Sequence, residues 1–181
     1  MRIISGKYKG KILSGYDIDG TRPTMDRVKE SLIASIQLKL PNAVILDLFT
    51  GSGSVGLEMI SNGAKSAYLV DKNPLVIKVL RKNLEILKAD EPIELINRSY
   101  EDALKLFKER NIKFDIIFLD PPYKMNLTDN SIKLIQENDL LNKDGLIICE
   151  KEFEEFDTYN YEIYKEKKYG SKKIIILRNN N

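Results

Sequence analysis

Short apolar segments alternate with longer amphipathic segments from residue 43 onward, and this alternation constrains the fold more than any other feature of the chain. It is typical of an α/β fold in which crossover helices cover both faces of a mostly parallel sheet. We expect strands at residues 44–49, 67–70, 93–96, 114–119 and 146–149, and helices near residues 54–62, 74–88, 100–110 and 128–138.

The last quarter of the chain follows a different pattern. Residues 159–167 alternate in polarity, residues 169–171 form a turn signal, and residues 172–178 are again typical of a strand. This pair predicts a terminal antiparallel hairpin that closes the sheet.

The first 41 residues precede the α/β pattern. Glycines separate short apolar pairs in residues 1–20, which predicts a small hairpin or arm. A helix follows, with Thr24 as its expected cap and its end near Leu40. We expect residues 1–41 to be an appendage on the substrate side rather than an independent domain, and residues 42–181 to be the catalytic domain.

Composition excludes several kinds of chemistry. The 181 residues suit one domain and include no histidine and a single cysteine, which rules out a zinc site and any Ser-His or Cys-His pair. Cys149 lies in an apolar run, so we expect a buried, reduced thiol. No apolar run approaches the roughly 18 residues of a membrane span, and the polar, basic amino terminus is unlike a signal peptide. We therefore expect a cytoplasmic protein without a bound metal.

A glycine loop follows the first expected strand, in the order Asp47-Leu48-Phe49-Thr50-Gly51-Ser52-Gly53-Ser54-Val55-Gly56. Glycines at this spacing allow the tight turn and close backbone approach that a nucleoside cofactor needs at a helix amino terminus. Asp71 ends the second strand, where a carboxylate can accept hydrogen bonds from ribose hydroxyls. An ordinary strand-to-helix turn and a surface helix cap are the structural alternatives for the loop and for Asp71.

The fourth expected strand ends abruptly at Asp120-Pro121-Pro122-Tyr123. Prolines stop the strand because they lack an amide hydrogen, and ligands bind at this edge of open parallel sheets. The Asp120 carboxylate and the Pro121 carbonyl can accept hydrogen bonds from an exocyclic NH2 group, while Tyr123 can stack on a planar ring. The alternative is a loop with an Asp turn cap and a packing tyrosine.

Together these motifs resemble class I S-adenosylmethionine-dependent methyltransferases that modify exocyclic amines of bases. Segments 2–6, 22–24 and 26–30, with Gly10 and Leu32, are similar to the amino-terminal signature of the RsmD family, which methylates the guanine N2 amine at position 966 of 16S ribosomal RNA. The resemblance covers nearly the whole chain and implies a Rossmann-like sheet of seven strands with the last antiparallel. The chain departs from the family at Ser99, where relatives have an acid near the adenine amine, so either the Ser99 hydroxyl or the Tyr100 backbone would serve instead.

The resemblance and the motifs assign the site residues. Asp120, Pro121, Pro122 and Tyr123 are the expected catalytic residues. The expected S-adenosylmethionine contacts are Asp47, Phe49, Thr50, Gly51, Ser52, Gly53, Asp71, Lys72, Ser99, Tyr100 and Asp120. The expected RNA contacts are Arg2, Lys7, Lys9, Arg22, Thr24 and Arg27, with ordinary capping and solvated surface charge as the alternative.

The expected partner is ribosomal RNA, either naked or within a partly assembled small subunit, and the expected state is a monomer. Three other functions share part of the pattern: a DNA adenine-N6 or cytosine-N4 amino-methyltransferase, a nicotinamide oxidoreductase, and a non-catalytic RNA-binding module of ribosome assembly. A DNA methyltransferase normally carries a separate target-recognition region, for which this chain has no room. An oxidoreductase would give no reason for the Pro-Pro-Tyr turn.

Overall fold

The computed structural model describes residues 1–15, 23–122, 126–152 and 157–180. Its strands are β1 (Val44–Asp47), β2 (Ser66–Val70), β3 (Ile93–Ile96), β4 (Phe114–Leu119), β5 (Leu141–Glu152), β6 (Tyr161–Tyr169) and β7 (Lys172–Asn179). Its helices are α1 (Pro23–Ile36), α2 (Ser54–Ser61), α3 (Pro74–Leu87), α4 (Tyr100–Glu109) and α5 (Leu127–Glu137), with a short 3-10 helix at Gln37–Lys39.

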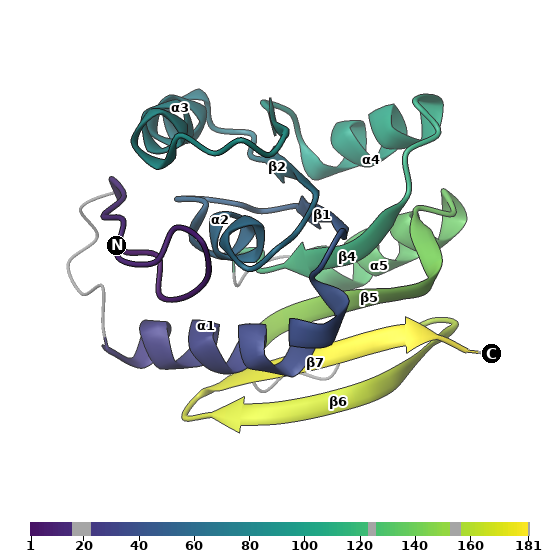
Figure 1. Ribbon diagram of the computed structural model, residues 1–181. Coiled ribbons are helices and arrows are strands. Elements are labelled where there is room, and N and C mark those ends of the chain that lie inside the picture. Colours follow the sequence, from purple (N-terminus) through teal and green to yellow (C-terminus); the bar gives the residue numbers. More distant parts are fainter. Residues whose placement is uncertain (16–22, 123–125, 153–156, 181) are drawn as a thin grey trace.

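The strands form one sheet with the order β3-β2-β1-β4-β5-β7-β6 (Figure 1). Strands β1 to β5 run parallel, and β7 pairs antiparallel with both β5 and β6. Over the described residues this confirms the predicted Rossmann-like sheet of seven strands, in which the last strand is antiparallel.

Helices cover both faces of the sheet. Helices α1, α2 and α3 pack with one set of buried side chains, and α4 and α5 pack with the other. Strand β4 is apolar along most of its length because it lies between these two layers, with β1 and β5 on either side. None of the helices in the described part of the chain is long and apolar enough to span a membrane.

Several element boundaries differ from the predictions. Strand β5 begins at Leu141, five residues earlier than expected, since Leu141 already pairs with Phe114 ahead of an irregularity in the register. Residues 142–145 lack the apolar pattern of a strand, which hides its beginning in the sequence. Thr24 is not the cap of α1, because the helix already begins at Pro23, and a proline suits the first helical position.

The amino-terminal residues form a small arm beside α2 (Figure 1). An antiparallel bridge joins Arg2 to Ile12, and the Ile3 amide donates to the Lys11 carbonyl at 3.0 Å. Within residues 1–15 this confirms the predicted hairpin-like arm. The arm and α1 lie on the same face of the sheet as α2.

Candidate functional site

The glycine loop is folded around the carboxylate of Asp47 at the end of β1. Its Oδ2 accepts hydrogen bonds from the Thr50 hydroxyl and the Gly56 amide, both at 3.1 Å. A Cβ on Gly56 would stand 2.5 Å from Leu69 Cδ2 and 3.1 Å from Asp47 Oδ2, so only glycine fits there. Gly51 and Gly53 have φ values of 51° and 80°, in the left-handed region that favours glycine.

The second oxygen of Asp47, Oδ1, is buried and has no hydrogen-bond partner among the described residues. Burial raises the pKa of Asp47 to about 7, against the opposing effect of the Thr50 and Gly56 hydrogen bonds. An orphaned carboxylate oxygen beside a glycine loop can accept a hydrogen bond from a cationic group of a ligand. A Cβ on Gly51 would meet nothing within 4 Å, so the space above the loop is open.

Asp71 connects the end of β2 to the same loop. Its Oδ2 accepts from the Gly51 amide at 3.2 Å, and its Oδ1 accepts from the Asn73 amide at 2.9 Å. Each carboxylate oxygen has a second lone pair for a further donor, such as a ribose hydroxyl. The neighbouring Lys72 is exposed, and Ser52 is half-buried in the loop.

Ser99 is the cap of α4. Its hydroxyl accepts from the Asp102 amide at 3.2 Å and donates to the Asp102 carboxylate at 3.1 Å. The Ser-x-x-Asp spacing before a helix is the sequence signal for this cap. Tyr100 begins the helix and packs against Phe49, with ring centroids 5.6 Å apart, so these two predicted residues do lie together.

Asp120 lies directly after β4, next to the sheet edge where β1 and β2 also end. It is half-buried, and Pro121 is buried whereas Pro122 is exposed. Burial is the main reason that the pKa of Asp120 rises to about 7; the negative charges of Glu150 and Asp47 add to the rise, and Lys172 opposes it. Tyr123 lies outside the described residues.

The sequence places Glu150 at the same sheet edge and leaves two interpretations open, a part of the substrate pocket or a solvated side chain, whereas Lys172 was not predicted as part of the site. Leu119 pairs with Cys149 in the parallel register of β4 and β5, so the next residues, Asp120 and Glu150, are neighbours across the two strands. Lys172 of β7 forms an ion pair with Glu150. The place of Glu150 at a strand end is visible in the sequence, but its partner Lys172 depends on how the terminal hairpin folds back on β5.

The predicted RNA contacts differ in their surroundings. Lys7 forms ion pairs with Asp90 and Glu91, both at 3.0 Å, and Arg2 lies 3.6 Å from Asp26. Lys9 and Arg27 are exposed. Arg22 and the Thr24 side chain lie outside the described residues.

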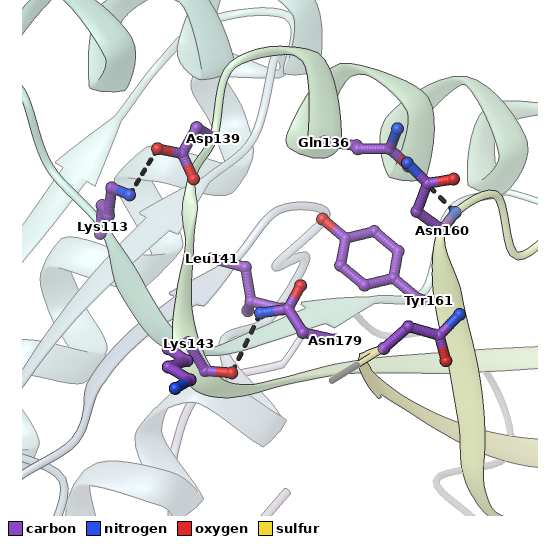
Figure 2. Close-up of a pocket in the computed structure, with 9 residues that line it drawn as sticks. Lys113, Gln136, Asp139, Leu141, Lys143, Asn160, Tyr161 and Asn179 are labelled. Carbon is purple, nitrogen blue, oxygen red and sulfur yellow. Dashed lines mark hydrogen bonds and ion pairs between the residues drawn. The ribbon is translucent and has the colours of Figure 1, made fainter.

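One cavity of the described residues lies elsewhere (Figure 2). It measures about 540 Å³ and is lined by residues from the opposite edge of the sheet, where β4, β5 and β6 begin and β7 ends. Figure 2 shows the ring of Tyr161 among polar side chains, with Lys113 paired to Asp139. None of the predicted site residues lines this cavity.

Three comparisons bear on this arrangement. The family model described as conserved hypothetical protein 95 matches residues 1–178. Ribosomal RNA small subunit methyltransferase D of Haemophilus influenzae is 38% identical over 173 residues, which cover 94% of this chain and 89% of the relative. The structure of the Escherichia coli protein yhhF has a TM-score of 0.87 at 32% identity and covers 99% of this chain and 97% of its own.

A more distant structure shares the fold alone. The SAM-dependent methyltransferase from Agrobacterium tumefaciens has a TM-score of 0.61 at 18% identity, over 74% of this chain and 46% of its own. The glycine loop, the strand-end carboxylates and the antiparallel last strand thus occur within a fold that methyltransferases share.

Proposed function

Because this chain belongs to the family described as conserved hypothetical protein 95, we propose that it is an S-adenosylmethionine-dependent methyltransferase of ribosomal RNA that acts on the exocyclic N2 amine of a guanine in the small-subunit (16S) molecule. The observation that carries the proposal is the half-buried Asp120 carboxylate, placed beside the sheet edge that also holds the glycine loop. The Haemophilus influenzae relative, named a ribosomal RNA small subunit methyltransferase, supports the choice of substrate.

The residues around the glycine loop fit S-adenosylmethionine. Asp47 Oδ1, which is buried and has no partner in the described part of the chain, suits the cationic amino group of the cofactor. Asp71 would accept hydrogen bonds from the ribose hydroxyls, and Gly51, where a Cβ would meet nothing within 4 Å, leaves room for close approach of the cofactor to the backbone. The loop residues Thr50 and Ser52, together with Phe49, Lys72, Ser99 and Tyr100, complete the proposed contacts.

Asp120 is assigned to hold and activate the base amine. An amine attached to an aromatic ring is a poor nucleophile because its lone pair is delocalised. Hydrogen bonds from the amine hydrogens to the Asp120 carboxylate and the Pro121 carbonyl favour a pyramidal nitrogen, and a charge-assisted hydrogen bond contributes about 1.5–3 kcal/mol. Pro122 fixes the turn, and Tyr123, assigned from sequence alone, would stack on the base for about 1–3 kcal/mol.

The bound cofactor supplies an electrophilic methyl group and leaves as S-adenosylhomocysteine. The amine nitrogen gains the methyl carbon and becomes cationic, so it must lose one proton. Asp120 would accept that proton, with solvent as the other acceptor. Most of the remaining acceleration comes from alignment of the amine with the methyl group.

Substitution of Asp120 tests the proposal. Asp120→Ala should lower methyl transfer to 16S ribosomal RNA by about 10²–10³-fold, because it removes the main acceptor aimed at the developing charge. Binding of S-adenosylhomocysteine, measured by calorimetry, should survive. Equal loss of turnover and cofactor binding would contradict the assigned role.

Three measurements separate the rival functions from the proposed one. Transfer of labelled methyl groups to duplex DNA but not to ribosomal RNA would indicate a DNA amino-methyltransferase. Tight binding of NAD without binding of S-adenosylhomocysteine would indicate an oxidoreductase. An unchanged cellular phenotype of Asp120→Ala would indicate a non-catalytic RNA-binding module.

A further inference from the structure

A buried ion pair joins the amino-terminal arm to the helix that follows the glycine loop. Lys29 of α1 and Glu58 of α2 lie 3.1 Å apart, with side chains 6% and 0% exposed. Removing two charges from water costs several kcal/mol per ion, so a pair of this kind persists only with good geometry and further hydrogen bonds. The proposed chemistry gives these two residues no role.

Glu58 holds the arm through its backbone. Its carboxylate accepts hydrogen bonds from the Ile4 amide at 3.0 Å, the Ser5 amide at 2.8 Å and the Ser5 hydroxyl at 2.9 Å. Backbone amides of the arm thus use a helix side chain as their acceptor. Without Glu58 these amides would need water or another acceptor.

Lys29 also forms hydrogen bonds with both the arm and α2. Its ammonium donates to the Arg2 carbonyl at 2.9 Å and to the hydroxyl of Ser54, the first residue of α2, at 3.1 Å. Arg2 is one of the predicted RNA contacts, and its guanidinium lies 3.6 Å from Asp26 on α1. The backbone of Arg2 is therefore fixed to α1, and its exposed guanidinium forms a surface ion pair with the same helix.

Two further contacts fix the arm along its length. Buried Asn83 of α3 accepts from the Ser14 amide at 2.7 Å and donates to the carbonyls of Ser14 and, in the glycine loop, Ser52. Gly6 approaches α2 so closely that a Cβ would stand 1.9 Å from the Ser61 carbonyl oxygen. The arm is thus held at its start, its turn and its end.

We propose that Lys29 and Glu58 are positioning residues for the RNA substrate, because they dock the basic arm on α2 and present Arg2 and its neighbours in a fixed arrangement. The inference rests on the proposed function, since it takes RNA as the ligand of the arm. A free basic segment would lose conformational entropy on each encounter with RNA, whereas a docked arm has lost that entropy during folding.

The first test removes the pair as a unit. The double variant Lys29→Met/Glu58→Met avoids an uncompensated buried charge and leaves every predicted RNA contact in place. We expect faster hydrogen exchange at the Ile4 and Ser5 amides and a rise of roughly tenfold or more in KM for RNA. The kcat and the affinity for S-adenosylhomocysteine should stay near the wild-type values. A merely structural role would lower the folded fraction and leave KM unchanged.

A second variant releases the arm without touching the charges. Gly6→Ala meets the Ser61 carbonyl, whereas the matched control Gly10→Ala, also at positive φ, meets nothing within 4 Å. KM for RNA should rise in Gly6→Ala and stay close to wild type in Gly10→Ala. Wild-type KM in both the double variant and Gly6→Ala, despite faster exchange in the arm, would overturn the inference.

The proposed function is judged separately, on the wild-type protein. Absence of methyl transfer to ribosomal RNA by the wild type would overturn both the function and the inference. Transfer by the wild type with an unchanged KM in the two variants would overturn the inference alone.

Discussion

At the scale of single residues, the site holds two carboxylates on adjacent strands, and burial raises the pKa of both. Asp47 of β1 and Asp120 after β4 both have a pKa raised to about 7, and burial is the largest cause for each. Glu150 adds a negative charge beside Asp120, and Lys172 partly offsets it through their ion pair. The ionised form of Asp120 is the better hydrogen-bond acceptor for an amine.

The pH dependence of activity follows from this arrangement. An acid whose pKa is raised to about 7 loses its charge as the pH falls through 7, so kcat/KM for RNA, measured at saturating cofactor, should fall on the acid side of pH 7. Glu150→Gln removes a charge that raises the Asp120 pKa and should move the acid limb to lower pH. Lys172→Met removes a charge that lowers the Asp120 pKa and should move the acid limb of the pH profile to higher pH. Identical limbs in the wild type and both variants would contradict this account of Asp120.

At the scale of elements, the loop between β1 and α2 depends on Gly56. Gly56→Ala forces Cβ against Leu69 Cδ2 and the Asp47 carboxylate, and overpacking of this kind costs about 1–3 kcal/mol of stability. We expect a lower melting temperature and weaker binding of S-adenosylhomocysteine by calorimetry, since the displaced carboxylate organises the loop. The control Gly170→Ala, in the turn between β6 and β7, meets no atom within 4 Å and should leave cofactor binding intact. Equal affinity for S-adenosylhomocysteine in the two variants would contradict the proposal that the Asp47 carboxylate organises the cofactor loop.

Elements and motifs that depend on local sequence were predictable. The alternation of short apolar and longer amphipathic segments after residue 43 predicted the strands of the sheet and the helices that cover it. The amino-terminal signature predicted the family, which the comparisons confirm. Val28, Leu32, Ile33 and Ile36 recur at helical spacing in the sequence of α1, and all four are buried. Strand β5 was predicted too short because residues 142–145 interrupt the apolar pattern although they lie within the strand.

Long-range polar contacts were not predictable in the same way. Lys29 lies among the buried apolar residues of α1, and Glu58 lies within an apolar run of α2. Each is therefore a charged residue that interrupts an otherwise apolar pattern. Nothing local indicates that the two exceptions pair with each other. For Lys7, its position in a basic arm predicted an RNA contact. In the structure its ammonium instead forms ion pairs with Asp90 and Glu91, which lie far along the chain.

At the scale of the whole molecule, the two edges of the sheet differ. The carboxyl ends of the parallel strands hold the glycine loop, Asp71, Asp120 and Glu150, and the arm is docked on α2 through Glu58. The opposite edge holds the cavity around Tyr161, away from these residues (Figure 2). We therefore propose that RNA approaches the carboxyl edge, with the arm supplying phosphate contacts and Asp120 receiving the base amine.

The central claim is that this chain methylates the N2 amine of a guanine in small-subunit ribosomal RNA. The most direct measurement compares the modified nucleosides of that RNA from cells with the gene, without it, and without it but complemented by either the wild type or Asp120→Ala. We predict that N2-methylguanosine falls in cells without the gene, returns with the wild type and does not return with Asp120→Ala. An unchanged amount of N2-methylguanosine in cells without the gene would contradict the account.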